Sequence, residues 1–186
     1  MYQGIYQDGQ LQDHEAIFLL GLLAEVDPSI VLEIATYFGH TTRRMAEELP
    51  EAIIHTLDLP LDYLERPDPV SLRKDDMHLV RRRQVGHEFI GQACSLNIIQ
   101  HWGDSATWDF RQAAGATFFF IDGSHTYEYV MNDSEKCFRL CDGLGTFVWH
   151  DAGHPPIVKF LKEWADMGCD IKFVPGTMLA YWRSNV

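Results

Sequence analysis

Four acidic residues stand at or just past the ends of short apolar runs that have the composition of buried β-strands. These acids are Asp58, Asp104, Asp122 and Asp151. In an open α/β sheet the carboxyl ends of the parallel strands share one edge, and ligands bind there where the strand order reverses. Because a buried acid is costly unless something pairs with it, we expect these four acids to serve one shared site.

A fifth feature of this edge is the loop E-x-A-x-x-x-G, from Glu33 to Gly39, which follows the first apolar run. A glycine in such a loop lets the backbone approach a ligand closely. An acid about twenty residues further along, here Asp58, is placed to bind a ribose diol. Both features also suit a dinucleotide, but the G-x-G-x-x-G fingerprint of nicotinamide-binding domains is absent.

The segments that position these residues alternate between strand-like and helix-like patterns. Strand-like runs cover residues 29–35, 52–58, 97–101, 116–122, 146–151, about 170–175 and 178–183. Helix-like runs cover residues 12–26, 40–49, 106–114, 125–141 and 156–167. The alternation predicts an α/β fold, a Rossmann-like doubly wound seven-stranded sheet that is mostly parallel, with helices on both faces. The turn signal Pro175-Gly176 predicts a C-terminal antiparallel β-hairpin, whereas a nicotinamide-binding domain would end on parallel strands.

The chain of 186 residues has the length of one domain, so we expect residues 1–186 to form a single unit. Residues 1–28 would carry an N-terminal helix, whose apolar positions at helical spacing are Leu11, Ile17, Leu20, Leu23 and Ala24. The prolines and charges of residues 60–95 predict a loop followed by one or two short helices on the substrate side of the domain.

The net charge of −12 argues against nucleic acid as the main partner, because phosphate binding needs a positive field. The cluster Arg81-Arg82-Arg83, with Arg73 and Lys74 nearby, favours a solvated helix face over a clamp for an anionic substrate. The apolar run from Ile17 to Ala24 is too short to span a membrane and lacks the flanks of a signal peptide. We therefore expect a cytoplasmic protein without a membrane partner.

Several motifs together resemble one known family. Glu33-Ile-Ala35-Thr-Tyr-Phe-Gly39-His-Thr-Thr42 is similar to motif I of class I S-adenosylmethionine (SAM)-dependent methyltransferases. A branch of small O-methyltransferase-like proteins carries the pattern IDGxHxY…D…pGG…HD and a GDS after the third strand. The matching segments here are Phe120-Ile-Asp122-Gly-Ser-His125-Thr-Tyr127, Asp133, Gly143-Leu-Gly145, His150-Asp151 and Gly103-Asp104-Ser105. Ala35 stands where motif I has its middle glycine.

The resemblance implies SAM as the cofactor and a role for each matching position. Glu33 and Gly39 would shape the pocket for the methionine portion, and Asp58 would bind the ribose hydroxyls. Asp104 and Ser105 would lie near the adenine. Asp122 would face the sulfonium or a metal. The full set of implied cofactor-binding residues is Glu33, Ala35, Thr36, Gly39, Asp58, Asp104, Ser105, Asp122 and Gly123.

For catalysis, we expect His125 or His150 to take the proton of the acceptor hydroxyl, because an imidazole titrates near neutral pH. Asp122 and Asp151 would orient that base. In metal-dependent relatives, acids at these two positions hold a divalent cation, so the resemblance also implies a site for Mg²⁺ or another divalent cation at Asp122 and Asp151. His154 stands in the following loop, where we favour a surface histidine over one that lines the mouth of the site.

These observations favour SAM-dependent O-methylation of a small-molecule or sugar-like hydroxyl. A non-catalytic SAM-binding or partner-binding protein on the same fold is the alternative, and a nicotinamide oxidoreductase is a weaker one. Residues 60–95 and 152–156 would form most of the acceptor pocket, or a second subunit would contribute. An acceptor pocket with so few covering residues suggests a homodimer or a sizeable acceptor.

Overall fold

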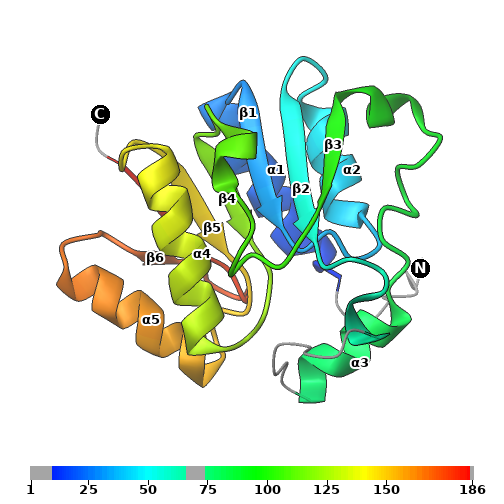
Figure 1. Cartoon of the computed structure of the whole chain (residues 1–186). Helices are drawn as coiled ribbons and strands as arrows, with labels where there is room; N and C mark the ends of the chain where they lie inside the picture. Colours follow the sequence, from blue (N-terminus) through cyan, green and yellow to red (C-terminus); the bar gives the residue numbers. More distant parts are fainter. Residues whose placement is uncertain (1–9, 66–73, 185–186) are drawn as a thin grey trace, which may run out of the picture.

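A computed structural model describes residues 10–65 and 74–184. Within these ranges the strands form one seven-stranded sheet with the order β3-β2-β1-β4-β5-β7-β6 (Figure 1). The strands are β1 (Ile30–Ile34), β2 (Ile53–Asp58), β3 (Ile98–Trp102), β4 (Phe118–Ile121), β5 (Thr146–Trp149), β6 (Lys172–Phe173) and β7 (Ala180–Arg183). The first five are parallel, and β7 lies antiparallel between β5 and β6. This confirms the predicted mostly parallel sheet and its terminal hairpin.

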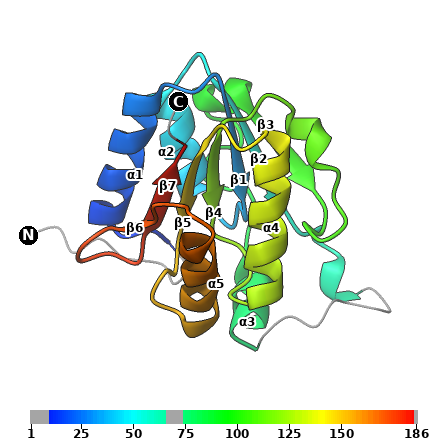
Figure 2. The ribbon, with the colours of Figure 1, turned by 90° about the vertical axis from the view of Figure 1, so that its left-hand side faces the viewer.

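Helices cover both faces of the sheet, as predicted (Figure 2). The α-helices are α1 (Asp13–Val26), α2 (His40–Glu48), α3 (Lys74–Arg82), α4 (Tyr127–Leu140) and α5 (Pro155–Asp166), and the short 3-10 helices are η1 (Tyr63–Glu65), η2 (Ala93–Asn97) and η3 (Phe110–Ala113). The helix expected over 106–114 shrinks to η3. Asp104 is the reason, because its carbonyl and side chain accept hydrogen bonds from three following amides and hold them in turns.

Side chains alternate across the sheet and build two apolar cores. Val31 and Phe120 pack with Leu19 and Leu23 of α1 and with α2 on one face. On the other face the core gathers aromatic rings against α4 and α5, with Trp149 edge-on to Trp164 at 5.6 Å between ring centroids. The two cores fix the sheet between its helices, so the carboxyl edge of the strands is a rigid platform.

The expected apolar face of α1 was right at Leu11 and Leu23, which are buried, and wrong at Ile17, which is 72% exposed, and at Ala24, which is also exposed. Ala16 and Leu19 face the core in their place, together with the carboxylate of Glu15. Glu15 accepts a hydrogen bond from the backbone amide of Met178, which turns this side of the helix toward the sheet.

The helix α3 lies below the carboxyl ends of the strands, away from both cores (Figure 1). It falls within the segment 60–95, where one or two short helices were predicted. Pro67, Pro69 and Arg73 of that prediction lie outside the described residues. No helix in the described part of the chain is long and apolar enough to cross a membrane.

Candidate active site

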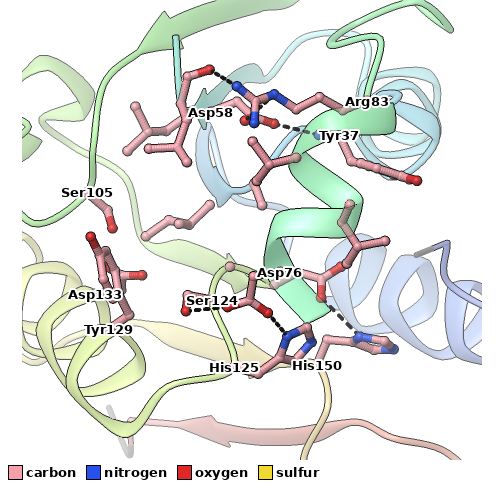
Figure 3. A pocket seen from close by; sticks show the side chains of 18 of the residues that line it. Tyr37, Asp58, Asp76, Arg83, Ser105, Ser124, His125, Tyr129, Asp133 and His150 are labelled. Atoms are coloured by element: carbon pink, nitrogen blue, oxygen red, sulfur yellow. Dashed lines mark hydrogen bonds and ion pairs between the residues drawn. The ribbon is translucent and has the colours of Figure 1, made fainter. Parts of the chain in front are cut away.

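A cavity of about 340 Å³ lies between the carboxyl edge of the sheet and α3 (Figure 3). The strand order reverses at β1 and β4, so the cavity lies where an α/β sheet binds its ligands. Its volume falls within the range of small-molecule sites. The lining residues are Gln10, Ile34, Ala35, Tyr37, Leu57, Asp58, Leu59, Asp76, Leu79, Val80, Arg83, Gly103, Asp104, Ser105, Asp122, Gly123, Ser124, His125, Tyr129, Asp133, His150 and Asp151.

Most of the residues singled out in the sequence meet at this cavity. Those in its lining are Ala35, Asp58, Asp104, Ser105, Asp122, Gly123, His125, His150 and Asp151. Glu33, Thr36 and Gly39 are absent from the lining and lie behind the wall. Residues 152–156 also contribute nothing to it, because Ala152 turns away to bond Met178 and α5 begins at Pro155.

Glu33 supports the wall from within the sheet. Its carboxylate accepts hydrogen bonds from the hydroxyls of Thr42 and Thr56, and Thr56 in turn pairs with Thr36 at 2.7 Å. Burial raises the pKa of Glu33 to about 8, against the pull of these hydroxyls. The network ties β1, β2 and α2 together just behind the loop that follows β1.

Gly39 serves the packing of that loop. Its φ of +87° is in the left-handed region, and a Cβ at this position would lie 2.7 Å from the ring of Phe89. Beside this contact, the backbone amide of Glu88 donates to the carbonyl of Phe38, and the amide of Gly86 donates to the carbonyl of Tyr37. The glycine therefore lets the segment before β3 close against the loop.

Ala35 lies in the lining with a φ of +77°, a conformation that residues with a Cβ adopt only at an energetic cost. Its amide donates to the carbonyl of Leu57, which holds the loop in this shape. The backbone thus keeps the conformation of a glycine at the position where motif I has one.

Asp58 lies at the end of β2 between a backbone amide and a guanidinium. Its Oδ2 accepts from the amide of Tyr37 at 2.8 Å, and its Oδ1 lies 3.4 Å from Nε of Arg83. The interpretation of the arginine cluster as a solvated face was wrong for Arg83, whose side chain is only 4% exposed. Arg81 and Arg82, the last two residues of α3, are exposed, as predicted.

Asp133 lies beside Tyr129 and Ser105 on a second side of the cavity (Figure 3). Asp104 also belongs to the lining there. Tyr129 donates its hydroxyl to Asp104 at 3.1 Å, and Tyr63 donates to the same carboxylate at 3.0 Å. Burial raises the pKa of Asp133 to about 6, although Ser105 and a neighbouring amide bond the carboxylate.

His125 bridges two carboxylates at the opposite end of the cavity. Nδ1 lies 2.6 Å from Oδ1 of Asp76 on α3, and Nε2 lies 2.6 Å from Oδ2 of Asp151 past β5. The bonds to Asp151 and then to Asp76 raise the pKa of His125 to about 10. His154 stacks on the His125 ring with the centroids 4.9 Å apart. At neutral pH the bridging ring is therefore an imidazolium.

His150, at the end of β5, is held among three acids. Nδ1 lies 3.0 Å from Asp122 and 3.1 Å from Asp151, and Nε2 lies 3.4 Å from Glu15. Burial alone would lower the pKa of His150, but these carboxylates raise it well above its ordinary value. Burial raises the pKa of Asp122, against the pull of His150.

This arrangement concerns the two histidines that are expected to act as the base. Both ring nitrogens of His125 and of His150 face carboxylates, so neither imidazole offers a lone pair at neutral pH. Asp122 is one of the lining carboxylates whose pKa burial raises, and its Oδ1 pairs with the ring of His150.

Sequence reasoning missed Asp76 and Glu15, and it assigned Arg83 to a solvated helix face. Asp76 and Arg83 come from the irregular segment 60–95, and no periodicity there shows which side chains point inward. Glu15 stands at the start of α1, where an acid ordinarily complements the helix end. Only the long-range pairing of α1 with β5 gives it a partner in the site.

Two groups of side chains at this end of the cavity could hold a divalent ion. Asp122, His150 and Asp151 form one, and His125, Asp151 and His154 form the other, with the ligand atoms of each group within 4.8 Å of one another. Mixed imidazole and carboxylate donors suit a transition-metal ion better than Mg²⁺, which prefers oxygen ligands. An ion would have to displace the protons that now join these groups.

Comparison with known proteins places the chain in a family. The profile of the family described as "Methyltransferase domain" matches residues 32–152, about two thirds of the chain. The chain belongs to this family. A search of the curated proteins finds no match.

Solved structures of methyltransferases share the fold. Cofactor-bound Rv0187 from MTB superposes with a TM-score of 0.67 at 17% identity, covering 95% of this chain and 83% of that one. PaMTH1 of Podospora anserina, bound to SAH, gives 0.65 at 14% identity, with 96% and 81% covered. The O-methyltransferase TomG from Streptomyces achromogenes, in complex with SAM, gives 0.62 at 14% identity, with 96% and 83% covered. The predicted Rossmann-like methyltransferase fold is therefore confirmed.

Proposed function

We propose that this protein transfers a methyl group from SAM to a hydroxyl oxygen of a small molecule. The observation that carries the proposal is the cavity at the switch point of the sheet, where Asp58, Asp104 and Asp122 meet at the ends of successive strands. PaMTH1, which has the same fold, binds SAH, and TomG is an O-methyltransferase in complex with SAM.

The residues present fit this cofactor. Asp58 offers a carboxylate for a ribose, Asp104 and Ser105 form a separate polar wall for a base, and the loop at Ala35 brings backbone to the lining. When bound, SAM supplies an electrophilic methyl group on a sulfonium. The acidic lining favours such a cation electrostatically.

Asp122 is the proton acceptor in this proposal. Burial raises the pKa of Asp122, which makes its carboxylate a stronger base. The His150 imidazolium, 3.0 Å away, orients Asp122, and His125 holds Asp151 in place behind it. His125 and His150 are thus positioning residues rather than bases.

The charge of the site also affects which methyl acceptors it can bind. Asp76, Asp122 and Asp151 surround the end of the cavity where the methyl group would be transferred. Carboxylates in this number disfavour an anionic acceptor, so we expect neutral or cationic hydroxyl compounds to react best. The acceptor is proposed to enter beside α3, which supplies Asp76, Leu79 and Val80 to the lining.

Calorimetry and product analysis test the proposal. The protein should bind SAM and SAH but not NAD, and it should methylate some member of a panel of neutral phenols, catechols and sugar alcohols. Asp122→Asn should keep SAH affinity and lower the methylation rate by about 100-fold. Asp109→Asn, an exposed acid paired with Arg111, is the matched control. Binding of NAD instead of SAH would refute the proposal.

The mechanism also depends on whether the site binds a divalent ion. Held by Asp122, His150 and Asp151, it would lower the pKa of an acceptor hydroxyl. Calorimetric titration of the chelator-treated protein with Mn²⁺, Zn²⁺ and Mg²⁺ tests this, with Asp151→Asn as the comparison. We expect the donor set to rank Mn²⁺ or Zn²⁺ above Mg²⁺. Tighter binding of Mg²⁺ would contradict that expectation.

A further inference from the structure

Arg83 is a buried cation that is incompletely bonded. Its Nη2 donates to the carbonyls of Leu59 at 2.9 Å and Pro60 at 2.8 Å, which fixes the guanidinium beneath the turn after β2. Nε lies 3.4 Å from Asp58 without the geometry of a hydrogen bond. Nη1 is buried and has no acceptor among the residues that the structure describes.

The cavity is where the missing acceptor would stand. Arg83 is part of its lining, and Figure 3 shows the guanidinium beside Asp58, at the end of the pocket opposite His125 and His150. A buried charged donor without an acceptor is costly, so a ligand that supplies one recovers that cost on binding.

The neighbouring Asp58 decides what kind of acceptor fits. A phosphate or carboxylate placed against Nη1 would also face the Asp58 carboxylate, and the two negative charges would repel each other. A hydroxyl can donate its proton to a carboxylate and accept a hydrogen bond at the same oxygen. The pair Asp58–Arg83 is therefore complementary to a hydroxyl and not to an anion.

We propose that Arg83 is a ligand-binding residue that donates through Nη1 to a ribose hydroxyl of the cofactor while Asp58 accepts from the same diol. The inference rests on the proposed function, because it takes the nucleoside of SAM as the occupant of this end of the cavity. It makes Arg83, which directly follows α3 within the substrate-side segment, a determinant of nucleoside specificity.

Binding of SAH and of its 2′-deoxy and 3′-deoxy analogues tests the role by calorimetry. The wild-type protein should bind SAH roughly 10- to 100-fold more tightly than at least one deoxy analogue, the range for hydrogen bonds that involve charged groups. In Arg83→Met this preference should shrink toward unity. Arg82→Met, on the exposed neighbour, should leave it unchanged. An unaltered preference in Arg83→Met would overturn the proposal.

A second comparison separates direct donation from mere support of Asp58. If Arg83 donates to the ribose itself, Arg83→Met must still reduce the preference for SAH when it is introduced into Asp58→Asn. No further reduction there would overturn the proposal. Arg83→Lys keeps a buried charge, so the same measurement can be made in it should the methionine variant not fold.

The controls keep this inference apart from the proposed function. Failure of the wild-type protein to bind SAH at all would refute the proposed function, whatever Arg83 does. Normal SAH affinity with equal affinity for both deoxy analogues would leave SAM binding intact and refute only the role of Arg83. Tighter binding of inorganic phosphate than of adenosine in the wild type would identify an anion site and also refute it.

Discussion

Oδ1 of Asp76 on α3 lies 2.6 Å from Nδ1 of His125 at the carboxyl edge of the sheet. Ser124 donates to the other oxygen of the same carboxylate at 2.7 Å. Because α3 packs against neither core, these contacts are the main described link that holds its first turn over the cavity. The geometry of the acceptor side of the pocket thus depends on one carboxylate from the segment that shows least pattern in the sequence.

Asp76→Asn tests that link. An amide keeps an acceptor for Ser124 but loses the charge opposite the His125 imidazolium, so we expect a loss of about 1–3 kcal/mol in the free energy of unfolding. Amide hydrogen exchange should accelerate in α3 and stay unchanged in α4. Asp109→Asn, which removes an exposed acid, should leave both measurements unchanged. Equal protection of α3 in the Asp76 variant would show that other contacts hold the helix.

The acids at the strand ends could be predicted because two simple patterns coincide there. An apolar run of strand length fixes where a strand ends, and parallel strands end at one edge, so Asp58 and Asp122 had to meet. Asp104 and Asp151 follow by the same argument. None of this depends on knowing how the helices pack.

The partners of those acids could not be predicted in the same way. Asp76 and Arg83 belong to a segment without periodicity, and Glu15 reaches His150 across 135 positions of the sequence. Each pairing depends on where a helix lies in space. The protonation of His125 and His150 was unpredictable for the same reason, because it follows from these partners.

Ala35→Gly tests the strain in the loop after β1. With a φ of +77°, Ala35 carries a conformational cost of about 1–2 kcal/mol that glycine avoids. Glycine in turn destabilises the folded state by about 0.5–1 kcal/mol, because the unfolded chain gains conformational entropy. We therefore expect a gain of up to about 1 kcal/mol in stability, measured by denaturant unfolding. Ala114→Gly, at an exposed position with a φ of −56°, should instead destabilise. A loss of stability in Ala35→Gly would mean that its methyl packing outweighs the strain.

Glu33→Gln tests the buried carboxyl group behind the wall. The folded-state pKa of Glu33 is about 8, above its ordinary 4.5, so the folded protein holds a proton that the unfolded chain releases. The contribution of Glu33 is complete below pH 4.5 and is lost as pH rises to 8, at roughly 1.4 kcal/mol per pH unit.

Urea unfolding between pH 5 and 9 measures this slope. Glu33→Gln cannot titrate, so its stability should fall less with rising pH than that of the wild type, whatever its absolute value. Glu51→Gln, the same change at an exposed position, should keep the wild-type slope. Parallel curves for wild type and Glu33→Gln would show that Glu33 is ionised in the folded protein.

The pair His55 and His101 is expected to lower the stability of the folded protein at acid pH. Nδ1 of His55 lies 2.8 Å from Nε2 of His101 on the neighbouring strand, and the rings stack with an angle of 7° between their planes. Two protonated rings cannot share this contact. Burial lowers the pKa of His55 and of His101, and the charge of His101 lowers that of His55 further.

The sign of the effect follows from the depressed pKa values. As pH falls through 6.5, the unfolded chain takes up protons before the folded protein does, so stability is lost from there down through the lowered folded pKa values. Replacing both histidines with glutamine should flatten the acid limb of the unfolding profile between pH 7 and 5. The double change at the exposed His78 and His87 is the control. An acid limb as steep as in the wild type would assign the loss to other groups.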